Sequence, residues 1–220
     1  MGVVTGIALD TRGQPLAGAT VWIQPALTTG LVKTRTGPDG RYEVRGLVTW
    51  LPYYAKAWTD VTYNGQSYCV RLGMPNAADF DAFAPDAATV RNFRWQLEGP
   101  IPDLQDRLYG GEVRLFPYGT FAAGDSVELR VTPKGPLVDG SAGRAVTRRV
   151  APNDIVQGFP HGVYTVQATL IEADGTRTDL RVGRSLSATA ESATLDWASS
   201  GPGCGNDSGL TRSFLYWERP

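Results

Sequence analysis

The sequence has only one histidine and two cysteines among its 220 residues. The single histidine, His161, cannot build a multi-histidine metal site, and it is the only imidazole available to a catalytic triad. No Gly-x-Ser-x-Gly segment supplies a nucleophile, and no Walker loop, dinucleotide-binding glycine motif or His-Glu-x-x-His motif is present. We therefore expect a protein that is not an enzyme and has no cofactor or metal. We interpret His161, in the turn Pro160-His161-Gly162, as solvated.

The sequence also lacks a strong charge of one sign and any long apolar run. Its formal net charge is −1, which provides no basic field to hold a phosphate backbone, so we expect no nucleic-acid partner. No apolar run approaches the roughly 18 residues of a membrane-spanning helix. Met1–Gly6 has neither the basic nor the apolar region of a signal peptide. This leaves a cytoplasmic protein, a mature fragment, or a protein exported without such a signal. We favour an extracellular, cell-surface or virion location.

The two cysteines, Cys69 and Cys204, are too few for a zinc site or a haem attachment. In an exported protein an even pair suggests a disulfide. We consider a Cys69–Cys204 bond possible. The alternative is two unrelated thiols, one in a strand and one in a glycine-rich loop.

Turn-forming residues are abundant, with 26 glycines and 15 prolines. They separate short runs rich in β-branched and aromatic residues, and Asn64-Gly65 between two such runs is a strong hairpin signal. We expect little helix, although residues 74–88 could hold one short helical turn or form a recognition loop. The pattern predicts an all-β protein of two tandem antiparallel β-sandwich domains. The expected domains are residues 1–98 and 108–220, joined by a Pro/Gly-rich linker at 99–107.

The two halves resemble each other over about half of each domain. Val44–Leu47, Tyr53–Ala57 and Cys69–Gly73 match Val156–Phe159, Tyr164–Ala168 and Asp179–Gly183, in that order. The outgoing strand of the matched hairpin is one residue longer in the first half. One extra residue would turn later side chains to the other face, so we predict a bulge near Trp58–Asp60. We expect each half to close with a strand ending on tryptophan, Val90–Trp95 and Thr194–Trp197.

The first 98 residues resemble the carboxypeptidase regulatory-like domain, a prealbumin-like sandwich. Four segments carry the resemblance: Gly6-Ile7-Ala8-Leu9-Asp10, Gly13-Gln14-Pro15-Leu16-Ala17-Gly18-Ala19-Thr20-Val21, Thr36-Gly37-Pro38-Asp39-Gly40-Arg41-Tyr42 and Val44-Arg45-Gly46-Leu47. The resemblance implies a seven-stranded fold that serves as an accessory module in secreted enzymes, adhesins, pilus shafts and outer-membrane receptors. It indicates fold and says little about function. The second half is more divergent and could be prealbumin-like or immunoglobulin-like.

Aromatic residues are the most informative class for function. Trp50, Tyr54, Trp58, Tyr63 and Tyr68 crowd one hairpin, and Phe80 and Phe83 lie in the following loop. If they face outward, they form a platform for sugar stacking or a protein contact; the alternative is core packing and cross-strand pairing. Phe214-Leu215-Tyr216-Trp217 is either a last strand or a tail that docks on a partner.

The acidic residues favour no reaction. Asp79 with Asp81, and Asp103 with Asp106, lie close together in loop-like segments, where solvation is the simpler interpretation than a glycosidase pair. Asp79, Asp81 and Asp86 could bind Ca²⁺, but without the spacing of an EF-hand. The sequence therefore predicts a non-catalytic surface or assembly module that contacts proteins or itself. The alternatives are a carbohydrate- or ligand-binding module that uses the Trp50–Tyr68 region, and a virion decoration or fibre component.

Overall fold

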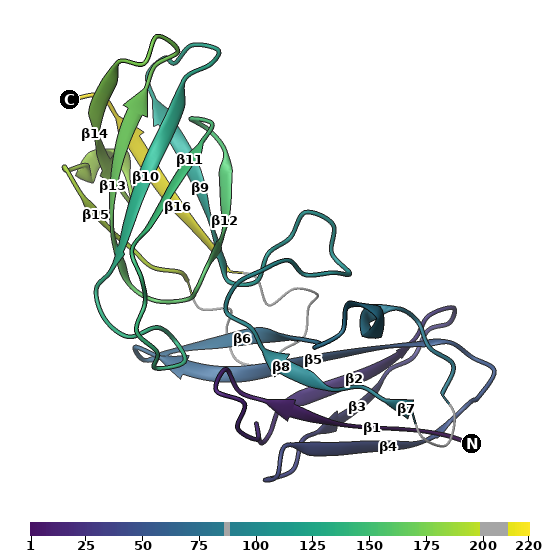
Figure 1. Cartoon of the computed structure of the whole chain (residues 1–220). Helices are drawn as coiled ribbons and strands as arrows, with labels where there is room; N and C mark the ends of the chain where they lie inside the picture. Colours follow the sequence, from purple (N-terminus) through teal and green to yellow (C-terminus); the bar gives the residue numbers. More distant parts are fainter. Residues whose placement is uncertain (86–88, 199–210) are drawn as a thin grey trace. The chain divides into compact units, whose positions relative to one another are not determined.

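The computed structural model describes residues 1–85, 89–198 and 211–220, and shows an all-β protein with two units (Figure 1). Of the described residues, those up to Tyr109 form the first unit, and those from Gly110 onward form the second. Each unit folds as two β-layers around its own core, which confirms two tandem β-sandwich domains. In the described residues no helix is long and apolar enough to span a membrane.

Eight strands and one short helical turn build the first unit. They are β1 (Gly2–Leu9), β2 (Thr20–Pro25), β3 (Val32–Arg35), β4 (Arg41–Leu47), β5 (Tyr53–Tyr63), β6 (Gln66–Gly73), η1 (Ala77–Phe80), β7 (Thr89–Val90) and β8 (Phe93–Trp95). The strand order is β3-β2-β5-β6-β8-β1-β4, and β7 pairs with β1. Strand β6 joins the two layers, because its first part pairs with β5 and its last two residues pair with β8.

The second unit repeats this arrangement. It consists of β9 (Gly111–Tyr118), β10 (Ser126–Pro133), β11 (Val146–Val150), β12 (Ile155–Phe159), β13 (Tyr164–Ile171), β14 (Arg177–Gly183), η2 (Leu186–Ala188), β15 (Ala193–Leu195) and β16 (Arg212–Glu218). Its order is β11-β10-β13-β14-β16-β9-β12. Replacing β1–β6 and β8 by β9–β14 and β16 converts one order into the other. In both units the closing strand runs parallel to the first strand, a departure from a purely antiparallel sandwich.

Equivalent residues occupy equivalent ladder positions in the two units. Tyr53 pairs with Pro25, and Tyr164 pairs with Pro133. Trp95 lies opposite Leu72, and Trp217 lies opposite Val182. The tryptophan that closes the second unit is therefore Trp217. The expectation for Thr194–Trp197 was wrong, because that segment supplies β15, which pairs with β13.

The predicted bulge near Trp58–Asp60 is also wrong. The β5–β6 ladder keeps one register from Trp58 to Tyr63. The one-residue difference is offset in the turns: Asn64-Gly65 is a two-residue loop, whereas Ala173–Gly175 is a three-residue loop. Together these differences shift the hairpin register by two residues, and an even shift leaves every side chain on its original face.

A bulge does occur in both units, at one equivalent glycine. Gly46 in β4 has φ +80° and Gly158 in β12 has φ +81°. Each glycine lies where the pairing with the first strand of its unit shifts register. A residue with a side chain is strained in this left-handed region, which explains why both positions are glycine.

The segment predicted as a linker, residues 99–107, lies within the first unit. Ile101 within the segment and Tyr109 just after it are both buried. Nη2 of the buried Arg71 donates hydrogen bonds of 2.7 and 2.6 Å to the two carboxylate oxygens of Asp103. The segment is thereby fixed to the outer face of β6.

Candidate interaction surface

The structure does not bring the predicted aromatic platform together. Trp58, Tyr68, Phe80 and Phe83 are buried, Tyr63 is half-buried, and only Trp50, 80% exposed, and Tyr54, 38% exposed, are open to solvent. For these four of the seven residues the structure therefore agrees with the alternative of core packing and not with an exposed platform. Hairpin composition revealed the aromatics but not which of them would be covered.

Trp58 is buried although it lies on the outer face of its strand. The core of the first unit takes Tyr53, Ala55 and Ala57, so alternation places Trp58 on the opposite face. There its ring lies 4.5 Å from that of Trp22, and the two form a buried cluster with Cys69. The sheet therefore carries a second small core on its outer face, which a one-face alternation pattern does not predict.

Cys69, in this cluster, is in a disulfide. Its predicted partner, Cys204, lies outside the described residues, so the Cys69–Cys204 pairing stays a prediction. The calcium hypothesis gains no support. Asp79 forms an ion pair with Arg91, with a nitrogen–oxygen distance of 3.6 Å, and Asp86 lies outside the described residues. Within the described ranges no three His, Cys, Asp or Glu residues are arranged to hold a metal ion.

His161 is not the solvated turn residue that its sequence neighbours predicted. It is 4% exposed, and its Nε2 lies 2.5 Å from Oγ1 of Thr211, just before β16. The Trp197 ring packs edge-on against it at 5.9 Å. Burial lowers the pKa of His161 to about 4, so the imidazole is neutral at physiological pH. Its hydrogen bond joins the turn to the residue that precedes the last strand.

The second unit carries a row of two exposed and two half-buried aromatic side chains on the outer face of β9 and β16. Phe116 and Tyr118 come from β9, and Phe214 and Tyr216 come from β16. Tyr118 is 61% exposed and Phe214 is 41% exposed. Phe116 stacks on Tyr216 with 5.1 Å between ring centroids and 19° between planes, and lies 5.9 Å from Phe214. We call these four residues, together with Arg114, the aromatic face.

Strand alternation explains why these rings point outward. In β16, Leu215 and Trp217 are fully buried beneath the sheet, and Phe214 and Tyr216 between them face out. The segment predicted as a last strand or a docking tail is thus a strand that also presents two rings to solvent. Four consecutive apolar residues at a chain end were the sequence signal that could have located this surface.

Charged side chains border the aromatic face on two sides. At one end Arg212 forms an ion pair with Glu112, and at the other Glu218 lies 3.7 Å from Nε of Arg181 and accepts a hydrogen bond from Thr189. The Arg114 guanidinium lies 5.3 Å from the Phe116 ring centroid and has no carboxylate partner in the described chain. A centre of aromatic rings and arginine inside a border of charges is the usual composition of a protein interface.

The first unit has no such face on the equivalent strands. Alignment at the shared bulge places Thr5, Ile7 and Leu9 of β1 where β9 has Arg114, Phe116 and Tyr118. The two units therefore keep the same fold and differ on this outer surface. Packing requirements do not account for the aromatic residues, because the fold forms without them in the first unit.

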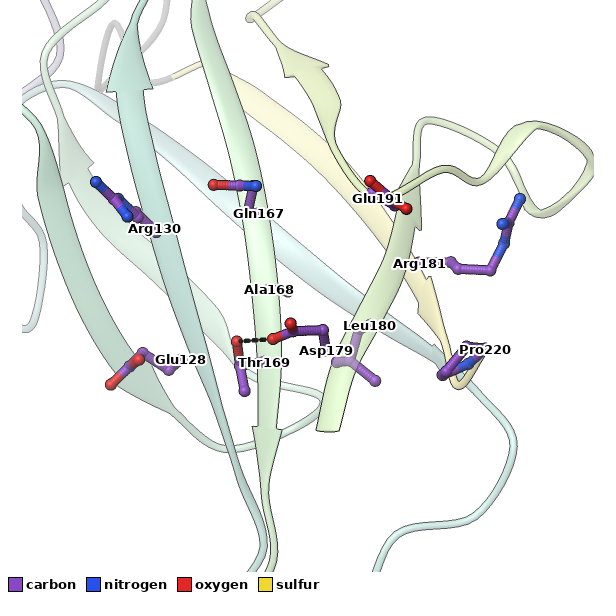
Figure 2. Close-up of a pocket in the computed structure, with 10 residues that line it drawn as sticks. All are labelled: Glu128, Arg130, Gln167, Ala168, Thr169, Asp179, Leu180, Arg181, Glu191 and Pro220. Carbon is purple, nitrogen blue, oxygen red and sulfur yellow. Dashed lines mark hydrogen bonds between the residues drawn. The ribbon is translucent and has the colours of Figure 1, made fainter. Parts of the chain in front are cut away.

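The opposite layer of the second unit carries a polar groove of about 620 Å³ on the outer face of β10, β13 and β14 (Figure 2). Ten residues line it: Glu128, Arg130, Gln167, Ala168, Thr169, Asp179, Leu180, Arg181, Glu191 and Pro220. Thr169 donates a 2.9 Å hydrogen bond to Asp179, and Glu128 pairs with Arg177. Arg130, Gln167 and Glu191 have no hydrogen-bond or ion-pair partner among the described residues, so they are available to a polar ligand.

Comparison with known proteins does not assign the chain to a family. No protein-family model matches the chain, and no curated protein matches it. The resemblance of the first 98 residues to the carboxypeptidase regulatory-like domain therefore stays a prediction.

Several solved structures are similar to the chain at low sequence identity. The chain is similar to the Bacillus anthracis TIE protein at 10% identity and a TM-score of 0.36, which covers 99% of this chain and 34% of that one. It is similar to a streptococcal ancillary pilin at 12% identity and a TM-score of 0.27, covering 100% and 62%. A major pilin subunit of Bacillus cereus gives 12% identity and a TM-score of 0.29, covering 83% and 70%. The chain thus spans about a third of the length of the TIE protein.

Proposed function

We propose that the protein is a non-catalytic assembly module that contacts another protein through the aromatic face of its second unit. The observation that carries this proposal is the row of outward-facing rings, in which Tyr118 and Phe214 are exposed and Phe116 and Tyr216 are half-buried. Exposed aromatic rings grouped on one face indicate an interaction site, whereas single exposed apolar residues such as Trp50 are ordinary.

The support beneath the aromatic face favours binding. Leu115, Leu215 and Trp217 are buried directly below it, and the Trp217 Nε1 donates a 2.8 Å hydrogen bond to the Pro152 carbonyl. Rings on a sheet held in this way lose little conformational freedom when a partner covers them, so more of the burial energy stabilises the complex.

One edge strand in each unit is poorly suited to pairing with a further strand. The edge strand β11 carries Arg148 and Arg149 among its five residues, and edge strand β3 carries Lys33 and Arg35. Cationic side chains on an edge oppose pairing with a further strand. At these two edges, pairing with another strand is therefore less favourable than contact through a sheet face. We place the module in a cell-surface, extracellular or particle assembly.

Oxidative footprinting tests the proposal. The protein would be oxidised by hydroxyl radicals once in its native surface or particle fraction and once as dilute purified chain, and modification would be read by mass spectrometry. We expect Tyr118 and Phe214 to be protected several-fold in the native fraction, with Trp50 of the first unit as the matched exposed control. Equal oxidation of Tyr118 and Phe214 in the two samples would contradict the proposal.

A second candidate function is the binding of a saccharide in the polar groove. The groove has the volume of a small-ligand site. It presents one guanidinium, one amide and one carboxylate whose side chains have no partner among the described residues: Arg130, Gln167 and Glu191. These groups suit the hydroxyl and acidic groups of a sugar better than an apolar ligand. Calorimetric titration with neutral and uronic-acid oligosaccharides checks this. Binding that Gln167→Ala leaves unchanged would exclude the groove.

A further inference from the structure

We infer that the partner of the aromatic face is a second copy of the same chain, related by a two-fold axis parallel to β9 and β16. The inference rests on the proposed function and adds the identity of the partner. Its basis is the pattern of residue pairs across these two strands.

Each outward-facing cross-strand pair joins two chemically complementary side chains. Because β9 and β16 are parallel, the rows are fixed by register: Arg212 with Glu112, Phe214 with Arg114, Tyr216 with Phe116, and Glu218 with Tyr118. The rows therefore combine base with acid, ring with cation, ring with ring, and carboxylate with phenol. No row repeats the same residue type on both strands.

A two-fold axis along the strands turns this lateral pattern into a contact between copies. Such an axis lays the two faces against each other, keeps each row opposite itself, and exchanges β9 with β16. Phe214 then meets the Arg114 position of the second copy, and Tyr216 meets the Phe116 position. The Tyr118 hydroxyl meets the Glu218 carboxylate. Every contact occurs twice, as an isologous interface requires.

The exposed side chains agree with this arrangement. Arg114 is exposed and lacks a carboxylate partner in the described chain, so a ring from a second copy would complete its surroundings by a cation–π contact. Glu112 is already buried under Arg212. The row of Arg212 and Glu112 therefore lies at one end of the face as an ion pair within the chain. The other three rows make the contact with the second copy.

A two-fold axis across the strands fits less well. It would reverse the order of the rows around Tyr216 and Phe116, so that Phe214 faced Glu218 of the second copy. Arg114 would face Tyr118, and Arg212 with Glu112 would lie beyond the contact. The carboxylate would then lose water against an apolar ring without gaining a donor, which is unfavourable.

The size of the face sets the expected strength of the dimer. In this layer β9 and β16 pair over seven residues, β12 has five residues and β14 adds three, and strands about 4.8 Å apart then give a flat area of about 350 Å². Side-chain relief increases this value, but it stays at or below the roughly 800 Å² per partner of a standard stable interface. We therefore expect a reversible dimer with a dissociation constant of about 1–100 µM.

Sedimentation equilibrium of the whole protein between about 1 and 300 µM tests the inference. We expect a monomer–dimer equilibrium, weakened at least tenfold by Phe214→Ser and by Tyr118→Ser. Trp50→Ser, which changes an exposed aromatic of the first unit, should leave it unchanged. Circular dichroism of each variant shows whether its fold is retained.

Two results would overturn the inference: a monomer at every concentration, or a dimer that both face variants leave unchanged. A monomer in solution combined with footprint protection of Tyr118 and Phe214 in the native fraction would leave the proposed function standing with a different protein as partner. A chain that stays monomeric and shows no protection of Tyr118 and Phe214 in the native fraction would reject the proposed function as well.

Cysteine cross-linking tests the orientation of the axis. Phe116→Cys and Tyr216→Cys would be made in separate chains, mixed at high concentration, and oxidised mildly. An axis along the strands predicts mainly a mixed 116–216 link. An axis across the strands predicts 116–116 and 216–216 links, and such homotypic links as the main products would overturn the proposed geometry.

Discussion

The side chain of Arg71 is held by Asp103, with one guanidinium nitrogen donating to both carboxylate oxygens at 2.7 and 2.6 Å. Arg71 lies on the outer face of β6, and Asp103 belongs to the segment that follows the last strand of the first unit. The pair fixes this segment to the sheet. Arg71 is 3% exposed, so its charge depends on Asp103 for compensation.

Replacing Asp103 by alanine should therefore destabilise the first unit by about 3 kcal/mol, because an unpaired charge would stay buried. Urea denaturation followed by tryptophan fluorescence measures the change. Glu43→Ala is the control, since it breaks an ion pair between exposed groups and should cost less than about 1 kcal/mol. Equal effects of the two changes would contradict a structural role for the Arg71–Asp103 pair. The double change Arg71→Met with Asp103→Leu should recover most of the loss.

The buried His161 should make the stability of the second unit depend on pH. Its pKa is near 6.5 when unfolded and about 4 when folded, so below pH 6.5 the unfolded chain binds a proton that the folded chain does not. The contribution is therefore fully present above pH 6.5 and is lost as pH falls towards 4, by up to about 1.4 kcal/mol per pH unit. Chemical denaturation of the wild type and of His161→Asn between pH 4 and 8 measures it.

Carboxylates also titrate near the lower end of this range, so the difference between the two proteins is the informative quantity. The chain has no second histidine to complicate it. We expect the wild type to lose stability more steeply than His161→Asn between pH 6.5 and 4.5. Parallel curves would show that the imidazole titrates normally in the folded protein.

The burial of His161 and of Trp58 could not be predicted from the sequence. Fold class, strand positions and the repeat followed from local signals: turn residues, alternation and matching hairpins. Burial of a turn histidine or of an outward-facing tryptophan depends on which distant segment lies above it. Thr211 covers His161 from 50 residues away, and Asp103 covers Arg71 from 32 residues away. No local pattern encodes such contacts.

The aromatic face could be predicted from the sequence only in part, because it too depends on contacts between distant segments. The sequence at 214–217 indicated a last strand or a docking tail, and the structure shows a strand with two outward rings. Its partners on the sheet, Phe116 and Tyr118, lie about 100 residues earlier and become neighbours through the parallel β9–β16 pairing. A parallel pair without a hairpin leaves no sequence signal of its register.

The bulge that the two units share can be tested through its glycines. Gly46→Ala and Gly158→Ala should each destabilise their own unit by about 1–2 kcal/mol, because both residues have a φ near +80°. Around Gly46 only the Met1 sulfur, at 3.9 Å, lies near an added Cβ, so backbone strain and not a clash causes the loss. Gly135→Ala is the control, since its φ is not positive and the space around it is open. Thermal denaturation measures all three, and a neutral Gly46→Ala would show that the bulge tolerates a side chain.

The disulfide prediction can be checked without any variant. Cys69 is disulfide-bonded, and Cys204 is the only other cysteine in the sequence. If the two are joined, tryptic digestion without reduction should yield residues 57–71 covalently linked to residues 185–212, and reduction should separate these peptides. Because Cys69 is packed with Trp22 and Trp58, reduction should also destabilise the first unit, by about 2–5 kcal/mol. Free, alkylated Cys69 in the unreduced sample would contradict the bond, and a link between two 57–71 peptides would show pairing between chains instead.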